Sequence, residues 1–259
     1  DYRLYGRTSG RRRNKTYSDT LGFAPLVIYS SGVFFMKLID MKTYPKRNQY
    51  NWFIQYQNPA YGFDVDIDCT EVVKESKEMK QSFFPHFLYR IMLAINSIPE
   101  LKMRVVDGKP YSYDVIHPTF TVMTKQGVYQ NCGFEMKENF PLFYQTCRAL
   151  IDEVKELEVN DELDRFPICK TPNVVFLTSI PTLNFTSMTH PLPIGNQESL
   201  SIPRACFGKY YQTEDGHYHV KLNLTVSHVF VDGYPLADCF RLIQELSNKR
   251  IEEIPVLLK

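Results

Sequence analysis

The stretch between residues 220 and 247 constrains the fold of this chain more than any other part of it. From residue 220 to residue 228 apolar and polar side chains alternate, which is typical of a strand with one face in the core. His228 continues the apolar series, so we expect its ring to point toward the core at the strand's end. Asp232 and Pro235 then suit the first turn of a helix. The buried stripe of that helix is expected at Leu236, Phe240, Ile243 and Leu246.

Two interpretations of His228 follow from this placement. A buried neutral imidazole can act as a general base, because the pKa of the ring lies near neutrality. The ring could instead be a core histidine that backbone groups satisfy, since structural sites also hold such groups. The spacing H-x-x-x-D-G from His228 to Gly233 favours the first interpretation, because it coincides with a strand end and a following helix.

The rest of the chain alternates between helix and strand patterns and predicts a mixed α/β protein with no clear linker after residue 36. Helices are expected over 70–80, 82–99 and 141–158. Strands are expected over 61–69 and 173–181, within 100–124, and as a long hairpin over 206–228. The second helix should bury a stripe made of Phe84, Phe87, Leu88, Ile91 and Ile95. Asp64, Asp66 and Asp68 share one face of the first strand, which we expect to be solvated.

Composition narrows the possible partners and sites. The net charge of +1 gives no strong field for nucleic acid or an anionic membrane. The six cysteines lack C-x-x-C spacing, so we expect no metal site, no disulfide scaffold and a cytoplasmic location. Residues 1–35 combine a basic cluster with an interrupted apolar run that is too short to span a membrane. They could be a signal peptide, but we expect an extraneous or leader segment, with residues 36–259 forming one domain.

Four blocks, in this order, carry a resemblance to a known family. They are residues 83–122, residues 179–187 ("SIPTLNFTS"), residues 203–211 ("PRACFGKYY") and residues 227–248 ("SHVFVDGYPLADCFRLIQELSN"). From about Lys42 to Asn248 the chain resembles chloramphenicol acetyltransferase. The resemblance implies a two-layer α/β fold with a mixed sheet covered by helices, and a homotrimer with active sites between subunits. It also implies transfer of an acetyl group from acetyl-CoA to a hydroxyl of chloramphenicol, which inactivates the antibiotic.

The resemblance implies a role for each residue near the motif. His228 would take the proton of the acceptor hydroxyl, whose oxygen attacks the thioester directly without a covalent acyl-enzyme. Thr178 matches the family's active-site serine, which donates to the oxyanion, although the adjacent Ser179 is an alternative match. Asp232 would hold the histidine loop by pairing with Lys46 or with the next residue, Arg47; the preferred register gives Lys46.

Further positions match the acceptor pocket and the coenzyme site. Phe166 matches a pocket aromatic, and Lys209 with Tyr210 matches a pair near the coenzyme, although a solvated strand end explains that pair equally well. At other positions this chain departs from the family. Ser227 replaces the first of two histidines, and Phe53, beside Trp52, replaces a pocket tyrosine. Cys206 replaces a threonine, Tyr61 replaces a cysteine, and His190 replaces an apolar residue.

These departures leave three functions open. The acceptor could be chloramphenicol or a different small hydroxylated molecule, because changes at a pocket wall alter selectivity. The chain could also bind CoA or another ligand without catalysis. The acyltransferase cores of 2-oxoacid dehydrogenase complexes share the H-x-x-x-D-G motif, but the lipoyl and subunit-binding modules of those chains are not recognisable in this sequence.

Overall fold

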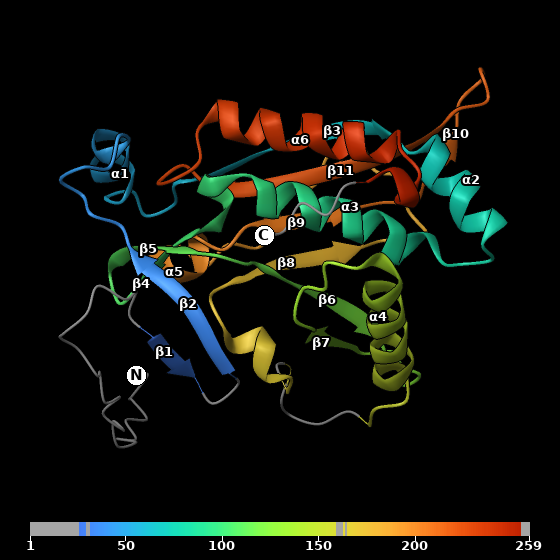
Figure 1. Cartoon of the computed structure of the whole chain (residues 1–259), viewed down its shortest axis with the longest axis horizontal. Helices are drawn as coiled ribbons and strands as arrows, with labels where there is room; N and C mark the ends of the chain where they lie inside the picture. The colour runs from blue at the N-terminus through green and yellow to red at the C-terminus, as the bar shows by residue number, and fades with distance from the viewer. Residues whose placement is uncertain (1–25, 30–31, 159–162, 164, 255–259) are drawn as a thin grey trace, which may run out of the picture.

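The computed structural model describes residues 26–29, 32–158, 163 and 165–254. Residues 1–25, most of the expected leader segment, lie outside that range. The described chain forms two sheets with helices packed mainly on one side, as Figure 1 shows.

Among the described residues, seven strands form the larger sheet. Their order is β10 (Tyr211–Gln212), β11 (Tyr218–Ser227), β9 (Arg204–Phe207), β8 (Val174–Ser179), β6 (His117–Met123) and β7 (Tyr129–Gly133), and β3 (Ala60–Asp68) pairs with β11 on its other side. Strand β8 runs parallel to β6 and β9, whereas the other pairs are antiparallel. The sheet is therefore mixed, which confirms the predicted α/β class.

A smaller antiparallel sheet has the order β1 (Leu26–Tyr29), β2 (Gly32–Leu38), β5 (Lys109–Tyr113) and β4 (Met103–Val106). Strands β4 and β5 join through the Asp107-Gly108 turn, as the sequence predicted. The sequence patterns did not predict β1 and β2. Strand β2 begins ahead of Met36, and the buried Met36 lies opposite Tyr113 of β5.

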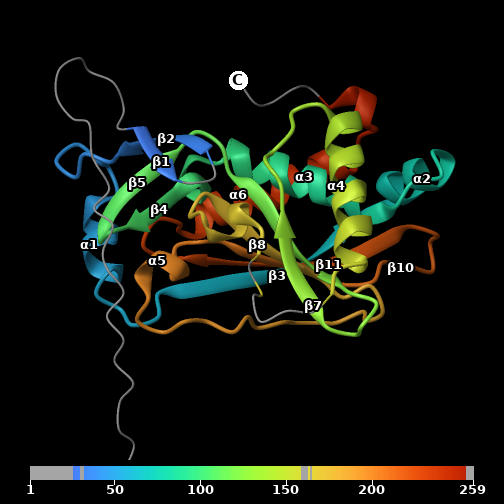
Figure 2. The same ribbon diagram turned by 90° about the horizontal axis from the view of Figure 1, so that it is seen from below.

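Four longer helices cover one face of the larger sheet, as the two views together show (Figure 1, Figure 2). They are α2 (Thr70–Glu78), α3 (Phe83–Ser97), α4 (Phe140–Lys155) and α6 (Gly233–Ser247). The shorter helices α1 (Arg47–Phe53) and α5 (Gln197–Leu200) lie near the end of β11, and 3-10 turns span Pro99–Lys102, Pro167–Lys170 and Ile251–Glu253. The connection between β8 and α5 runs along the opposite face of the sheet (Figure 2).

Helix α3 is buried almost all the way round, from Pro85 to Asn96. The predicted stripe was therefore too narrow, because α3 packs on α2, α4 and α6 as well as on the sheet. Its Arg90 is completely buried and donates to Glu75 of α2 at 3.0 Å. Nδ1 of the buried His86 lies 3.3 Å from the same carboxylate oxygen, and the N–H of Ile251 donates to the other oxygen at 2.8 Å. A buried charge cluster thus joins α2, α3 and the turn that follows α6.

The aspartate face of β3 is not simply solvated, contrary to the sequence-based expectation. The antiparallel register sets Asp64 opposite Asn223, and the amide of Asn223 donates to it at 3.0 Å. Asp66 accepts from the hydroxyl of Tyr211 at 2.7 Å. Asp68 forms an ion pair with His217 at 2.8 Å and accepts from Thr70. Asn223 of β11 and Tyr211 of β10 therefore hold the first two carboxylates, and the turn before β11 and the start of α2 hold the third.

All six cysteines are buried thiols outside any disulfide: Cys69, Cys132, Cys147, Cys169, Cys206 and Cys239. Within the described ranges, no helix combines the length and the apolar character needed to cross a lipid bilayer.

Candidate active site

His228 lies directly after the last residue of β11, at the strand end that the alternation predicted. Its backbone N–H donates to the carbonyl of Pro59 at 2.9 Å, which ties it to the start of β3. The side-chain amide of Gln49 in α1 donates to the carbonyl of His228, also at 2.9 Å. Sequence reasoning missed Gln49, because a residue 179 positions away carries no local signal.

Two aromatic rings hold the imidazole of His228. Phe53 stacks on it, with ring centroids 4.0 Å apart and planes 12° apart, and Tyr61 lies at 4.8 Å on a tilted plane. Nδ1 is buried without a hydrogen-bond partner, so backbone groups do not satisfy this ring as they would in an ordinary core histidine. Nε2 is not among the buried unpartnered atoms, and no described residue bonds it. Nε2 is therefore the nitrogen that a ligand can reach.

Tyr61 closes one side of this cluster. Its hydroxyl donates to the carbonyl of Val231, in the loop after His228, at 3.3 Å. Burial, with a smaller contribution from the charge of Asp232, raises the pKa of Tyr61 to about 12. The phenol therefore stays neutral at ordinary pH and braces the loop as a hydrogen-bond donor.

Asp232 and Lys46 form an ion pair, with Oδ2 and Nζ 3.0 Å apart. Asp232 also caps α6 by accepting from the N–H of Tyr234. Lys46 reaches a second carboxylate, that of Glu100, at 2.7 Å. Burial alone would lower the pKa of Lys46, but its hydrogen bonds to Glu100 and Asp232 outweigh burial and raise it. The charged lysine thus links α1, the Pro99–Lys102 turn and the start of α6; sequence reasoning missed Glu100.

A second cluster forms a row across four neighbouring strands. Thr178 of β8 lies opposite Cys206 of β9, Cys206 lies opposite Asn223 of β11, and Asn223 lies opposite Asp64 of β3. Directly opposed residues share one face of a sheet. Burial and the charge of Asp64 raise the pKa of Cys206 to about 11, so the thiol stays neutral.

The register of β8 against β9 also shows which of Thr178 and Ser179 lies on the face that carries Cys206 and Asn223. Ser179 lies opposite Phe207, whose ring packs on Phe83 and Phe87 of α3. Ser179 therefore belongs to the helix-covered face, and Thr178 belongs to the face shared with Cys206. His190, in the connection between β8 and α5, lies over this second face with Nε2 3.1 Å from Oδ1 of Asn223.

One chain does not bring the two clusters together. His228 lies five residues beyond Asn223, and at about 3.3 Å per residue the two are roughly 17 Å apart along β11. The structure thus joins His228, Phe53, Tyr61 and the Lys46–Asp232 pair at one end of the sheet. Thr178, Cys206 and His190 lie in a separate row.

The remaining candidates are more scattered. Trp52 is 63% exposed, and its indole donates to the hydroxyl of Tyr56. Phe166 is half-buried at the start of the Pro167–Lys170 turn. The side chain of Lys209 is exposed, and the ring of Tyr210 packs on Phe83 with centroids 5.0 Å apart. Tyr210 precedes β10, which pairs with the end of β11 farthest from His228.

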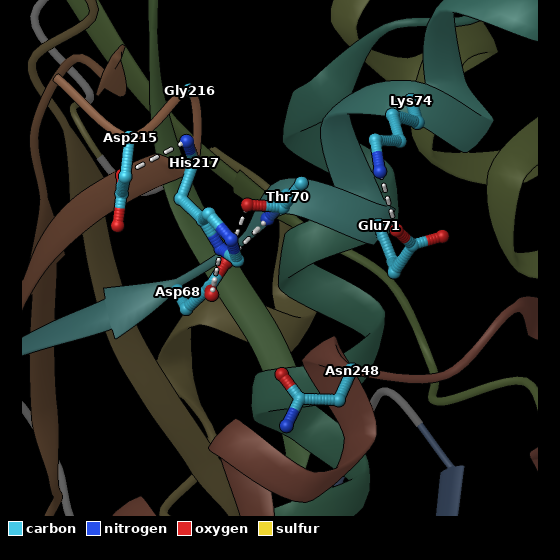
Figure 3. Close-up of a pocket in the computed structure, with 8 residues that line it drawn as sticks. All are labelled: Asp68, Thr70, Glu71, Lys74, Asp215, Gly216, His217 and Asn248. Atoms are coloured by element: carbon cyan, nitrogen blue, oxygen red, sulfur yellow. Dashed lines mark hydrogen bonds and ion pairs between the residues drawn. The ribbon is translucent and has the colours of Figure 1, made fainter. Parts of the chain in front are cut away.

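An open cavity of about 470 Å³ also lies at that far end of β11 (Figure 3). Asp68, His217 and Lys74 contribute to its wall. Figure 3 shows the ring of His217 directed at Asp68, its ion-pair partner, and Lys74 paired with Glu71. The cavity is therefore separate from both clusters. In the described part of the chain, no group of three or more His, Cys, Asp or Glu residues is arranged to hold a metal ion.

Comparison with known proteins gives the class. The family model described as chloramphenicol acetyltransferase matches residues 34–247. A chloramphenicol acetyltransferase of Clostridium perfringens is 27% identical over 214 residues, covering 82% of this chain and 94% of that protein. A chloramphenicol acetyltransferase of Bacillus pumilus is 26% identical over 200 residues, which cover 76% of this chain and 87% of that protein.

Solved structures agree with this class. A structure of chloramphenicol acetyltransferase superposes with a TM-score of 0.74 at 25% identity, covering 82% of this chain and 99% of that one. The cubic core of the pyruvate dehydrogenase multienzyme complex superposes with a TM-score of 0.56 at 14% identity, covering 77% of this chain and 85% of that one. At this identity the likeness shows a shared fold and nothing more. The fold and the matched family define an acyltransferase. Within that class, the chain belongs to the chloramphenicol acetyltransferase family.

Proposed function

We propose that this enzyme transfers the acetyl group of acetyl-CoA to a hydroxyl of chloramphenicol, and thereby inactivates the antibiotic in the cytoplasm. The observation that carries the proposal is the placement of His228 within the matched family region. Its ring is clamped by Phe53 and Tyr61, and only Nε2 is open to a ligand. A general base must be held in one orientation and must reach the proton that it removes; the two packed rings support the first condition, and the open Nε2 supports the second.

The reaction then proceeds within a ternary complex. Nε2 of His228 takes the proton of the acceptor hydroxyl while the hydroxyl oxygen attacks the thioester carbonyl carbon. Nδ1 carries the ring hydrogen before this step, since a neutral imidazole has only one. The tetrahedral intermediate collapses as its C–S bond breaks, and the departing CoA sulfur takes the proton back from the imidazolium. The ring ends in its starting state, and no acyl-enzyme forms.

A second copy of the chain would supply the other half of each site. The intermediate carries a negative oxygen, for which the hydroxyl of Thr178 is the proposed donor. Thr178 and His228 lie in separate clusters of one chain, which supports a site with His228 from one subunit and Thr178 from its neighbour, as in the homotrimer that the family resemblance implies.

The other pocket positions fit this arrangement as predictions. Cys206, which lies opposite Thr178, and His190, which contacts Asn223 in the same row, would line the acceptor pocket, with Phe166 as a further aromatic contact. The exposed ring of Trp52 is available to a neighbouring subunit. The exposed ammonium of Lys209 suits the phosphates of CoA, with Tyr210 beside it.

Turnover of chloramphenicol and acetyl-CoA, measured as release of free CoA, tests the role of His228. We expect His228→Ala to lower kcat by at least ~100-fold, the usual contribution of a general base. His217→Ala, which changes an exposed histidine at the far end of β11, is the matched control and should keep its activity. Retained turnover in His228→Ala would contradict the assignment.

Mixing two inactive variants tests the shared site. His228→Ala and Thr178→Val are refolded together in equal amounts. If each site takes its histidine and its threonine from different chains, about a quarter of the sites are intact, because each requirement is met half the time. Recovery of about a quarter of wild-type turnover supports an active site shared between subunits, and no recovery contradicts it.

A different small hydroxylated acceptor is the second candidate function. The specific observation is Tyr61, whose ring lies 4.8 Å from that of His228 where the family has a smaller residue. A panel of hydroxylated molecules compared by kcat/KM decides between the acceptors. A non-catalytic CoA-binding role is opposed by the open Nε2 of His228; calorimetric binding of acetyl-CoA without turnover on any acceptor would favour it.

A further inference from the structure

We propose that His190 is a specificity-determining residue, whose Nδ1 accepts a hydrogen bond from a hydroxyl or amide N–H on the acceptor molecule. This inference rests on the proposed function, because it places the acceptor beside the row of Thr178 and Cys206. It concerns a position where this chain departs from the apolar wall of the family that it resembles.

The side chain of Asn223 is 2% exposed, and its contacts fix the orientation of its amide. Its Nδ2 faces two acceptors, Oδ1 of Asp64 at 3.0 Å and the carbonyl of Met188 at 3.2 Å. Its Oδ1 faces Nε2 of His190 at 3.1 Å and receives the hydroxyl of Thr225 at 3.0 Å. A flipped amide would set its carbonyl oxygen against a carboxylate and a second carbonyl. The observed orientation is therefore the one in which every contact joins a donor to an acceptor.

The orientation of Asn223 determines the tautomer of His190. Since Oδ1 of Asn223 can only accept, Nε2 of His190 must carry the hydrogen. A neutral imidazole has one ring hydrogen, so Nδ1 presents a lone pair. No described residue bonds Nδ1, and Nδ1 is not among the sealed, unpartnered atoms of the structure. A ligand can therefore reach this acceptor atom.

The surroundings keep His190 neutral. Burial lowers its pKa, and the charge of Arg204 on β9 lowers it further. The bond to Asn223 and the charge of Asp64 on β3 act in the opposite direction, but the net change is downward. The thiol of Cys206, the third titratable group on this face, is itself neutral because burial raises its pKa to about 11. At neutral pH, Nδ1 of His190 is thus an acceptor rather than a donor.

The connection that carries His190 is held firmly over the sheet. The N–H of Met188 donates to Asp64 at 3.2 Å, and its carbonyl accepts from Asn223. His190 therefore presents Nδ1 at a defined place above the same face as Thr178 and Cys206. An acceptor molecule with a hydroxyl or amide N–H at that place gains a hydrogen bond, whereas an ether or an alkyl group there leaves the lone pair unpaired.

Kinetics with a matched pair of acceptors test the proposal. One acceptor is chloramphenicol, and the others are analogues in which each hydroxyl not acetylated, and the amide N–H, is methylated in turn. In the wild type we expect one of these methylations to raise the acceptor KM about tenfold, the scale of one neutral hydrogen bond. In His190→Phe, which keeps an aromatic ring without the acceptor atom, the same methylation should change KM by less than twofold. In both proteins the KM for acetyl-CoA should stay constant.

Rescue by His190→Gln is the matched control, because its side-chain carbonyl can accept the same hydrogen bond. Equal discrimination by wild type and His190→Phe would overturn the proposal, as would a change confined to the KM for acetyl-CoA. If the wild type binds chloramphenicol without turnover, the proposed function fails, and calorimetric affinities for the same acceptor pairs still decide the role of His190. Nitrogen-15 shifts of His190 in the wild type give a second readout: a protonated Nδ1 in the free enzyme would also overturn it.

Discussion

Replacing Glu75 by glutamine would measure how strongly the fold depends on the charge cluster between α2 and α3. The substitution keeps the size of the side chain but removes its charge. Arg90 and His86, both fully buried, would then face a neutral amide. The N–H of Ile251 would keep an acceptor at the same place, so the change isolates the ionic part of the cluster.

Two routes give the size of the effect. Burial alone would raise the pKa of Glu75, but contacts with His86, Ile251 and Arg90 outweigh it and lower the pKa from 4.5 to about 2. At 1.36 kcal/mol for each tenfold change in proton affinity, this corresponds to about 3 kcal/mol. Breaking a buried ion pair by removing one partner costs roughly 3–5 kcal/mol. We therefore expect Glu75→Gln to lose about 3 kcal/mol at pH 7.

Urea unfolding followed by circular dichroism, at one protein concentration, measures this loss. The depressed pKa of Glu75 adds stability that is complete above pH 4.5 and lost as the pH falls from 4.5 to about 2. The difference between wild type and variant should shrink over the same window. Glu71→Gln, one turn earlier on α2 and partly exposed, is the control and should cost less than about 1 kcal/mol. A loss below about 1 kcal/mol for Glu75→Gln, or a difference that stays constant down to pH 2.5, would refute the reasoning.

Two further predictions concern the start of α6 and the β3–β11 ladder. Asp232→Asn removes the ion pair with Lys46 but keeps a good helix cap, so urea unfolding should show a loss of about 1 kcal/mol or less; Asp232→Ala should lose about 1 kcal/mol more. Equal losses in the two variants would show that the cap contributes nothing. Gly62→Ala would set a methyl carbon 2.3 Å from the carbonyl oxygen of Leu224, forcing the strands apart at a cost of about 1–3 kcal/mol. Gly233→Ala, whose methyl would meet nothing within 4 Å, should cost far less when both variants are compared by urea unfolding.

Local patterns predicted the elements around His228, because they depend only on neighbouring residues. The alternation of residues 220–227 gave β11, and Pro235 with Asp232 gave the start of α6. The burial of α3 was underestimated, since a helix with neighbours on several sides needs no polar face.

Local patterns cannot predict which residues of two paired strands lie opposite each other. Asp64 was expected in water, but the register of β3 against β11 sets it opposite Asn223. The same information was needed to choose between Thr178 and Ser179, which adjoin in sequence and point to opposite faces. Gln49 contacts the backbone of His228 across 179 residues, and no spacing rule connects them. The catalytic and binding roles of these residues remain predictions, which the variants above address.

The burial of all six cysteines has a practical consequence for every assay of this enzyme. Burial raises the pKa of five of these thiols, to about 11 for Cys206, to about 12 for Cys147 and further for Cys69, Cys132 and Cys239, so almost none of the five is a reactive thiolate at neutral pH. A colorimetric reagent for sulfhydryl groups would therefore record the coenzyme released in each turnover against a nearly silent protein background. In the absence of substrate, the rate at which the same reagent labels the protein would report the rate of global unfolding, because each unfolding event exposes up to six thiols at once.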